Sequence, residues 1–311
     1  MSDGVLVVDA GTSGVRAAVV REDASIAAST YRQVLPTSPI PSFVEFDPIE
    51  MRDAVLDVAT AALADWGTAV ASVGITNQRS STVLWDRATG KPLGPGVSWQ
   101  DLRTVGMCLA LQAQGIRIAP NVSATKLVFL LDMVDPDRSR SEAGDLAFGT
   151  VDTWLAWCLS RGEVHVTDPS NACVTGLMLL DGSGWDPELL EALRIPEAVL
   201  PRIAASSEQM GAATALDGAP VIAGIAGDQQ ASLLGQGCVT PGAVKLTLGT
   251  GGMLDICVGE TRPSFAQRGP GGMVPMIAWR RGGVTNWLAE GLMLTAGTTI
   301  EWLRDDLGLL S

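Results

Sequence analysis

The chain has 311 residues, of which 47% are hydrophobic and 18% charged, so it is long enough to form two domains with separate cores. Its 21 Lys and Arg residues against 34 Asp and Glu give a formal net charge of −13. This charge argues against a nucleic-acid partner, which needs a broad basic surface. A nucleotide is not excluded, because backbone N–H groups and a divalent cation can hold its phosphates.

Cysteine and histidine content narrows the chemistry further. The five cysteines are widely spaced without a Cys-x-x-Cys pair, and the only histidine is His165, so a zinc site or a Ser-His-Asp triad lacks its residues. No basic residue precedes Arg16, which argues against a signal peptide. The apolar runs are shorter than the roughly 18 residues needed to cross a bilayer. We expect a cytoplasmic protein with no membrane partner.

The N-terminal region predicts three strands and then a helix. Apolar residues at 5–8 lead into the turn Gly11-Thr12-Ser13-Gly14, a second strand covers 15–20, and a third follows a turn at 22–25. A helix should begin at residues 47–50, Asp-Pro-Ile-Glu. There the Asp can act as the cap and the Pro suits the first helical position.

The next part of the chain indicates an α/β domain with a mixed sheet, because strands there alternate with helices. Strands are predicted at residues 70–76, 82–86 and 220–227, and helices at 101–114, 124–134, 151–160 and 186–193. A further short helix should run from Asp228 to about Gly235.

The pattern of the N-terminus returns near residue 243. Apolar residues at 243–258 flank a second glycine turn, and a final helix is predicted from about Asn286 to Leu307. We therefore expect one domain at residues 1–237 and a partial domain at 238–311. Two or three strands and one helix enclose a core poorly. Their unpaired edges should seek partners, so we expect a homo-oligomer.

Two glycine and hydroxyl turns are candidates for binding phosphate. Asp9 ends a strand just before Gly11, and residues 249–251, Gly-Thr-Gly, repeat this type of turn. Such turns point N–H groups at a phosphate, and a nearby carboxylate can orient Mg²⁺ through its waters. Either turn alone could be an ordinary hairpin. Because each opens a separate domain, the pair indicates a nucleotide held by both.

Two other strand ends carry polar groups. Asp228 could be only a helix cap, or it could accept a proton from an attacking hydroxyl. Asn77, Gln78 and Arg79 follow another strand, with Trp99 further on. Arg and Asn side chains hydrogen-bond hydroxyls, and a Trp face packs on carbon, so these residues could bind a polyol. The alternative is a polar strand end and a core tryptophan.

These motifs, in this order, resemble those of the FGGY carbohydrate kinases, and among them the glycerol kinases. The matching segments are residues 74–79, 99–101, 149–154, 167–172, 224–230 and 249–251. The resemblance implies an α/β protein with the actin-like, ribonuclease-H-like two-domain ATPase fold. The first domain would be complete and the second partial.

The resemblance also implies ATP and Mg²⁺ as cofactors and a role for each site residue. Asp228 would be the catalytic base, and Asp9 and Asp228 would lie at the metal. The phosphate-binding residues would be Gly11, Thr12, Ser13, Arg16, Gly249, Thr250 and Gly251. The residues of the substrate pocket would be Arg79, Ser80, Trp99, Asn121, Asp228, Gln229 and Met253.

Three pocket positions depart from the glycerol kinase pattern. Ser80 stands where those kinases have Glu, Asn121 where they have Tyr, and Met253 where they have Phe. Loss of the Glu removes a charged acceptor, whose hydrogen bond contributes about 1.5 to 3 kcal/mol. The expected partner is therefore a small-molecule polyol or sugar, and not necessarily glycerol.

The implied function is transfer of the γ-phosphoryl group of ATP to a hydroxyl of that polyol or sugar. The second domain of the family normally continues well beyond the position of Ser311. The alternative is therefore a truncated, catalytically inactive remnant that binds a polyol through its first domain but does not bind ATP.

Overall fold

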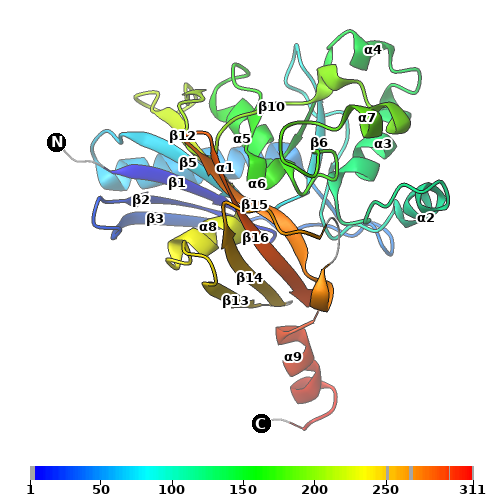
Figure 1. Ribbon diagram of the computed structural model, residues 1–311. Helices are drawn as coiled ribbons and strands as arrows, with labels where there is room; N and C mark the ends of the chain where they lie inside the picture. The colour runs from blue at the N-terminus through cyan, green and yellow to red at the C-terminus, as the bar shows by residue number, and fades with distance from the viewer. Residues whose placement is uncertain (1–3, 250–251, 266–268, 294, 310–311) are drawn as a thin grey trace. The chain divides into compact units, whose positions relative to one another are not determined.

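The computed structural model describes residues 4–249, 252–265, 269–293 and 295–309. The chain divides into two units, Met1–Asp228 and Gln229–Ser311, and Figure 1 shows the elements of each. The domain limit expected between residues 237 and 238 stays a prediction. Within the described ranges, no helix combines the length and the apolar composition that a membrane crossing requires.

A six-stranded mixed sheet forms the centre of the first unit (Figure 1). Its strands, in spatial order, are β11 (Gly211–Ala212), β12 (Val221–Gly227), β5 (Ser72–Asn77), β1 (Val5–Ala10), β2 (Gly14–Val20) and β3 (Ile26–Gln33). The three strands β12, β5 and β1 run parallel to one another. β2 pairs antiparallel with β1, and β3 pairs antiparallel with β2. The three strands predicted at the N-terminus are confirmed.

Helices α1 (Pro48–Trp66) and α5 (Val151–Leu159) pack on this sheet and contact each other. The predicted helix start is confirmed, since Asp47 accepts hydrogen bonds from the N–H groups of Ile49 and Glu50. The chain leaves the helix at Gly67, whose φ of 76° is a left-handed value that glycine adopts without strain. The buried side of α1 and alternate residues of β1 form a core with α5.

A second, four-stranded sheet lies in the same unit. Its order is β4 (Glu45–Phe46), β7 (Gly96–Val97), β6 (Thr82–Asp86) and β8 (Leu146–Thr150). The remaining elements are α2 (Val105–Ala113), α3 (Ser123–Val134), α4 (Ser139–Glu142), β9 (Val166–Thr167), α6 (Pro169–Ala172), α7 (Pro187–Leu193), η1 (Glu197–Val199) and β10 (Arg202–Ile203).

The helix predicted at 101–114 begins later than expected, at Val105. Asp101 is buried and accepts hydrogen bonds from the N–H groups of Val44 and Arg103 at 2.6 and 2.9 Å. It also pairs with the Arg103 guanidinium. These bonds hold the segment before α2 in a non-helical conformation, because Asp side chains compete with the helix for backbone donors.

In its described residues, the second unit contains a four-stranded antiparallel sheet and two α-helices. The sheet order is β13 (Val244–Leu248), β14 (Gly252–Gly259), β16 (Val284–Met293) and β15 (Val274–Arg281). The helices are α8 (Asp228–Gly235) and α9 (Gly297–Asp305), with a short helix η2 (Pro270–Gly272). The described residues thus give four strands where the sequence predicted two or three.

The prediction of one helix from Asn286 to Leu307 is wrong over its first part. Residues 284–293 form β16, which pairs with β14 and β15 on its two sides. This double pairing gives hydrogen-bond partners to the backbone N–H and C=O groups of the segment, which in a helix would bond to one another. Gly282 and Gly283, with φ values of 57° and 81°, make the tight turn between β15 and β16. Only Gly297–Asp305 is helical.

Candidate active site

Three parallel strands of the first sheet end at the same edge and bring the predicted acids together. The register pairs Asp9 of β1 with Thr76 of β5, and Asn77 of β5 with Gly227 of β12. Asp228 follows Gly227 directly, at the start of α8. Ligands bind at the carboxyl ends of parallel strands in open α/β sheets, so this edge is the candidate active site.

The two carboxylates at this edge influence each other. Burial raises the pKa of Asp9 above its ordinary value, the charge of Asp228 raises this pKa further, and the Arg16 guanidinium lowers it. A divalent cation would relieve this repulsion, because it favours the charged form of both acids. Mg²⁺ usually takes one or two protein carboxylates together with phosphate oxygens and waters. The donors present therefore fit magnesium.

Arg79 holds the predicted base. Its Nε lies 3.3 Å from Oδ1 of Asp228, and the two side chains are 9% and 37% exposed. The arginine is therefore anchored in the protein while the carboxylate remains open to solvent. This arrangement orients Asp228 and leaves it accessible to a substrate hydroxyl.

The first glycine turn is bonded to the predicted substrate motif. The N–H group of Gly11 donates to the carbonyl oxygen of Gly14 at 2.9 Å, which closes the turn. Trp99 Nε1 donates to Thr12 Oγ1 at 3.0 Å, and Gln78 Nε2 donates to the Gly11 carbonyl at 3.1 Å. The structure thus brings together the segments that the sequence analysis assigned to phosphate and to substrate.

Tyr31 supports the same turn from the neighbouring strand. Its hydroxyl donates to the Ser13 carbonyl at 3.2 Å, and the exposed Arg16 guanidinium lies 5.7 Å from its ring centroid. A Cβ on Gly14 would lie 2.4 Å from the tyrosine oxygen and 2.7 Å from the Arg32 carbonyl oxygen. Only glycine fits there, because no real Cβ approaches so closely.

Ser80, the next predicted pocket residue, is buried and has a left-handed φ of 64°. Its hydroxyl donates to the Val174 carbonyl at 2.9 Å, and its own carbonyl accepts from Ser123 Oγ at 2.9 Å. A non-glycine residue in this conformation is strained, and such strain clusters at functional sites.

The other predicted residues that the structure describes belong partly to the first unit and partly to the second. Asn121 is exposed, and its carbonyl accepts a hydrogen bond from Lys126 Nζ at 3.0 Å. Gln229 and Met253 belong to the second unit, as does Gly249, whose carbonyl accepts from the Gly297 N–H at 2.7 Å. Thr250 and Gly251 lie outside the described residues.

Comparison with known proteins gives the family. Residues 4–235 match the family model described as the FGGY family of carbohydrate kinases, N-terminal domain. The chain belongs to the FGGY family. The resemblance found in the sequence is therefore confirmed.

Among the FGGY kinases, the chain is similar to glycerol kinases. It is 42% identical to the glycerol kinase of Alkalilimnicola ehrlichii over 322 residues and 42% identical to that of Dechloromonas aromatica. These matches cover 98% and 99% of this chain but only 64% and 63% of the two kinases. The chain thus spans less than two thirds of the length of these relatives.

A solved FGGY structure confirms the fold. The crystal structure of Plasmodium falciparum glycerol kinase with ADP is 26% identical and superposes with a TM-score of 0.90. It covers 98% of this chain, and this chain covers 64% of it. The expected actin-like ATPase fold with a partial second domain is therefore confirmed.

A buried hydrogen-bond network centred on Asp168 lies next to the strand ends of the candidate site. The sequence analysis assigned it no role. Both oxygens of Asp168 are used: Oδ1 accepts from Ser170 Oγ and the Asn171 N–H at 2.8 and 2.9 Å, and Oδ2 accepts from Ser206 Oγ at 2.6 Å. Burial raises the pKa of Asp168. The sequence signals for it were the match of residues 167–172 to the family pattern and the Asp-Pro helix start at 168 and 169.

This network reaches the site through three hydrogen bonds. Asn171 and Asn77 exchange hydrogen bonds between their side-chain amides at 3.0 and 3.2 Å. The N–H group of Gly227 donates to Ser170 Oγ at 2.9 Å. The network therefore fixes the end of β5 and the residue before the proposed base.

Asp152 is a second buried acid, and its raised pKa leads to a prediction about how stability depends on pH. Its oxygens accept from the hydroxyls of Thr150 and Thr167, yet burial raises its pKa from 3.8 to about 7. Between these values the folded state binds more protons than the unfolded state. The free energy of unfolding should therefore fall as the pH rises from about 4 to about 7, by at most about 1.4 kcal/mol per pH unit.

In the Asp152→Asn variant, the free energy of unfolding should lack the decrease between about pH 4 and pH 7 that is due to Asp152. The measurement is urea unfolding at a series of pH values for the wild type, for Asp152→Asn and for Asp217→Asn, an exposed control. If the wild type and Asp152→Asn showed the same pH dependence, the assignment of the raised pKa would be wrong.

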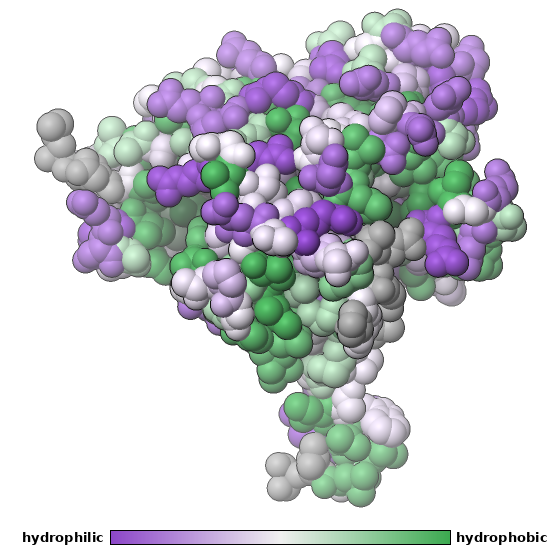
Figure 2. Space-filling model, in the orientation of Figure 1, coloured by the Kyte–Doolittle hydropathy of each residue, from purple (hydrophilic) through white to green (hydrophobic). Residues whose placement is uncertain are grey.

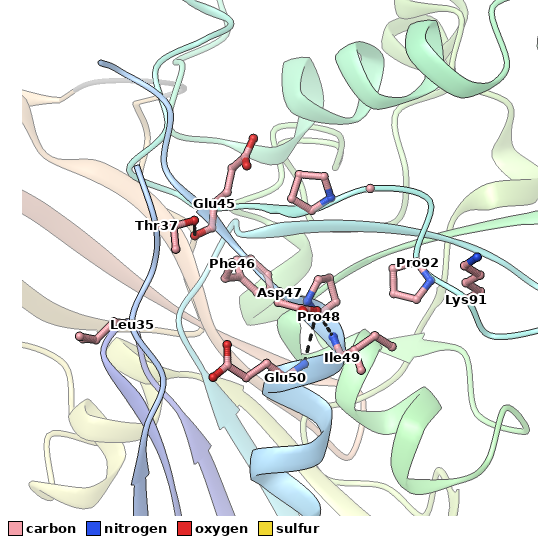
Figure 3. A pocket seen from close by; sticks show the side chains of 12 residues that line it. Leu35, Thr37, Glu45, Phe46, Asp47, Pro48, Ile49, Glu50, Lys91 and Pro92 are labelled. Atoms are coloured by element: carbon pink, nitrogen blue, oxygen red, sulfur yellow. Dashed lines mark hydrogen bonds between the residues drawn. The ribbon is translucent and has the colours of Figure 1, made fainter. Parts of the chain in front are cut away.

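A cavity of about 450 Å³ lies elsewhere in this FGGY domain, beside the start of α1 (Figure 3). Two of the carboxylates around it are engaged by the protein. Asp47 caps α1, as the dashed lines in Figure 3 show, and Glu45 pairs with Arg103. None of the predicted site residues lines it. This cavity is therefore distinct from the strand-end site.

Proposed function

We propose that this chain carries the substrate-binding and catalytic part of a kinase that transfers the γ-phosphoryl group of ATP to a hydroxyl of a polyol or sugar. The observation that supports this most directly is the Arg79–Asp228 pair at the edge where β1, β5 and β12 end. Asp228 acts as the base that accepts the proton of the attacking hydroxyl. Arg79 holds its carboxylate and lines the substrate pocket with Trp99.

The first glycine turn binds the phosphates in this proposal. In the turn from Gly11 to Ser13, the N–H group of Gly11 bonds Gly14, so Thr12 and Ser13 offer backbone N–H groups, and the exposed Arg16 supplies positive charge. Asp9 and Asp228 hold Mg²⁺, which when bound neutralises the phosphate charge. In phosphoryl transfer, positioning and electrostatic stabilisation supply most of the rate acceleration. The rigid strand ends and the Asp168 network serve this positioning.

The proposed substrate class rests on the family and on the three pocket positions that differ from the glycerol kinase pattern. The relatives are glycerol kinases, but Ser80, Asn121 and Met253 replace three of the residue types in their pattern. We therefore extend the substrate class to polyols and sugars in general.

The test is a coupled assay of ADP release with glycerol, erythritol, pentoses and their keto forms as acceptors. We expect release of ADP that depends on Mg²⁺ and on at least one acceptor. If no acceptor stimulates ADP release, phosphotransfer by this chain alone is refuted.

A second candidate is the inactive remnant, which the length comparison favours, since the chain spans 64% of its relatives. Such a protein would bind a polyol but not ATP. Calorimetry with a non-hydrolysable ATP analogue and Mg²⁺ separates the two. Micromolar binding of the analogue excludes the remnant, whereas polyol binding without nucleotide binding establishes it.

A further inference from the structure

The start of α3 is bonded to the candidate site. Ser123, the first residue of this helix, donates from Oγ to the Ser80 carbonyl at 2.9 Å. Ser80 directly follows Arg79, whose guanidinium pairs with Asp228. The chain segment that leads into α3 is therefore tied to the strand end that carries this arginine.

A fully buried lysine holds the same segment. Lys126 of α3 is 0% exposed, and its Nζ donates to the Asn121 carbonyl at 3.0 Å. Its side chain thus reaches back beyond the helix start to a residue that the sequence analysis assigned to the substrate pocket. Figure 2 shows hydrophilic side chains gathered on the surface of the first unit, around α4 and α7, where charged groups are normally found. The burial of Lys126 departs from this arrangement.

The burial of this cation costs stability. Within the described residues, the Asn121 carbonyl is the one hydrogen-bond acceptor of Lys126 Nζ, although an ammonium group has three N–H donors. Burial lowers the pKa of Lys126 from 10.5 to about 7. Positive charge is also unfavourable near a helix N-terminus, where the helix dipole is itself positive. A methionine of similar shape would avoid these costs, so stability alone does not explain the lysine.

The charged and titratable groups around Lys126 do not compensate its charge. Asp101 and Cys108 favour the charged form of the lysine, and Arg103 disfavours it. Asp101 is already paired with the Arg103 guanidinium. β6 also packs on α3, and its one charged residue, Asp86, pairs with an arginine elsewhere. In the part of the chain that the structure describes, Lys126 therefore has no ion-pair partner of its own, and its polar contact is the Asn121 carbonyl.

We propose that Lys126 is a positioning residue of the polyol pocket, which fixes the segment at Asn121 through its hydrogen bond and so raises the affinity for the acceptor. This inference rests on the proposed function, because it concerns the pocket in which the acceptor is bound. Lys126 does not touch the acceptor; it acts through the backbone of Asn121. A segment that is already held in its binding conformation loses less entropy when the ligand binds. Stability given up for such an arrangement is a common feature of functional sites.

The test compares Lys126→Met with the wild type in the full 311-residue chain. Calorimetry uses whichever of glycerol, erythritol and the pentoses the wild type binds most tightly. We expect the variant to bind this acceptor at least about 10-fold more weakly, because methionine fills the same space without an N–H donor. Urea unfolding should show that the variant is at least as stable as the wild type, since the cost of the buried cation is removed. A merely structural role of Lys126 predicts a loss of stability instead.

The pH dependence is a second readout, and in the wild type it needs no substitution. A charged donor bonds a carbonyl more strongly than a neutral amine does, so the affinity for the acceptor should fall about 5-fold between about pH 6 and about pH 8. The free energy of unfolding should change in the opposite direction. Between about pH 7 and about pH 10 the unfolded state binds more protons at Lys126 than the folded state, so stability rises with pH. Lys126→Met should lack both of these changes.

Lys91→Met is the matched control, because it makes the same chemical change at an exposed position of the first unit. Its affinity for the acceptor should equal that of the wild type. Full affinity in Lys126→Met would overturn the inference alone, as would affinity and stability that fall together. If the wild type bound no acceptor, the proposed function would fail and this inference with it, and the wild-type titration shows that before any variant is compared. Both the kinase and the inactive remnant bind a polyol, so the readout is independent of phosphotransfer.

Discussion

Replacement of Asp228 with Asn is expected to lower kcat by about 10²- to 10⁴-fold, the usual contribution of a general base. The amide has nearly the same shape but cannot accept the hydroxyl proton. Polyol binding should change little, because Arg79 and Trp99 remain in place. Turnover is measured by ADP release, and binding by calorimetry, in this chain and in a full-length glycerol kinase that carries the equivalent substitution.

Asp217→Asn is the control for this experiment, because it makes the same chemical change at an exposed position of the first unit. Its turnover should equal that of the wild type. Full turnover by Asp228→Asn in the full-length kinase would show that another group accepts the proton. The role proposed for the Arg79–Asp228 pair would then be wrong.

Replacement of Lys245 with Ala should destabilise the second unit by about 3 to 5 kcal/mol, the effect of breaking a buried ion pair from one side. Lys245 and Asp255 are both fully buried and lie 2.8 Å apart. Without the lysine, Asp255 would be left as an uncompensated charge. Hydrogen exchange of the β13 and β14 amides, followed by mass spectrometry, measures the change locally.

The double variant Lys245→Met with Asp255→Leu distinguishes the effect of the two charges from the effect of side-chain packing. Apolar residues of similar volume often replace a buried pair with little loss of stability. We therefore expect the double variant to recover most of the protection lost in Lys245→Ala. Unchanged exchange in Lys245→Ala would show that the pair does not hold this sheet together.

Local signals predicted much of the first unit. The apolar run at residues 5–8 and the Asp-Pro sequence at 47 and 48 are read directly from neighbouring positions, and the strand and the helix start that they predicted were confirmed. The strand ends followed from the same signals, so Asp9, Asn77 and Asp228 were each expected at the end of a strand, and their meeting at one edge was found only in the structure. Their chemical roles remain predictions.

The remaining features depend on contacts between distant residues. Asn77 and Asn171 are 94 positions apart in the chain, and no local pattern indicates that their amides meet. The Lys245–Asp255 pair was missed for a related reason, since a charged residue in a strand is normally expected to face solvent. β16 was mistaken for a helix, although Gly282-Gly283 was a readable hairpin signal.

The support of the first glycine turn by Tyr31 has a practical consequence. Tyr31 is the only tyrosine among the 311 residues, and its hydroxyl bonds the turn at Ser13. Isotope labelling of tyrosine would therefore give a single magnetic-resonance signal, reporting on this loop without interference from the rest of the molecule. Titration of that one resonance with nucleotide would follow events at the turn directly in solution.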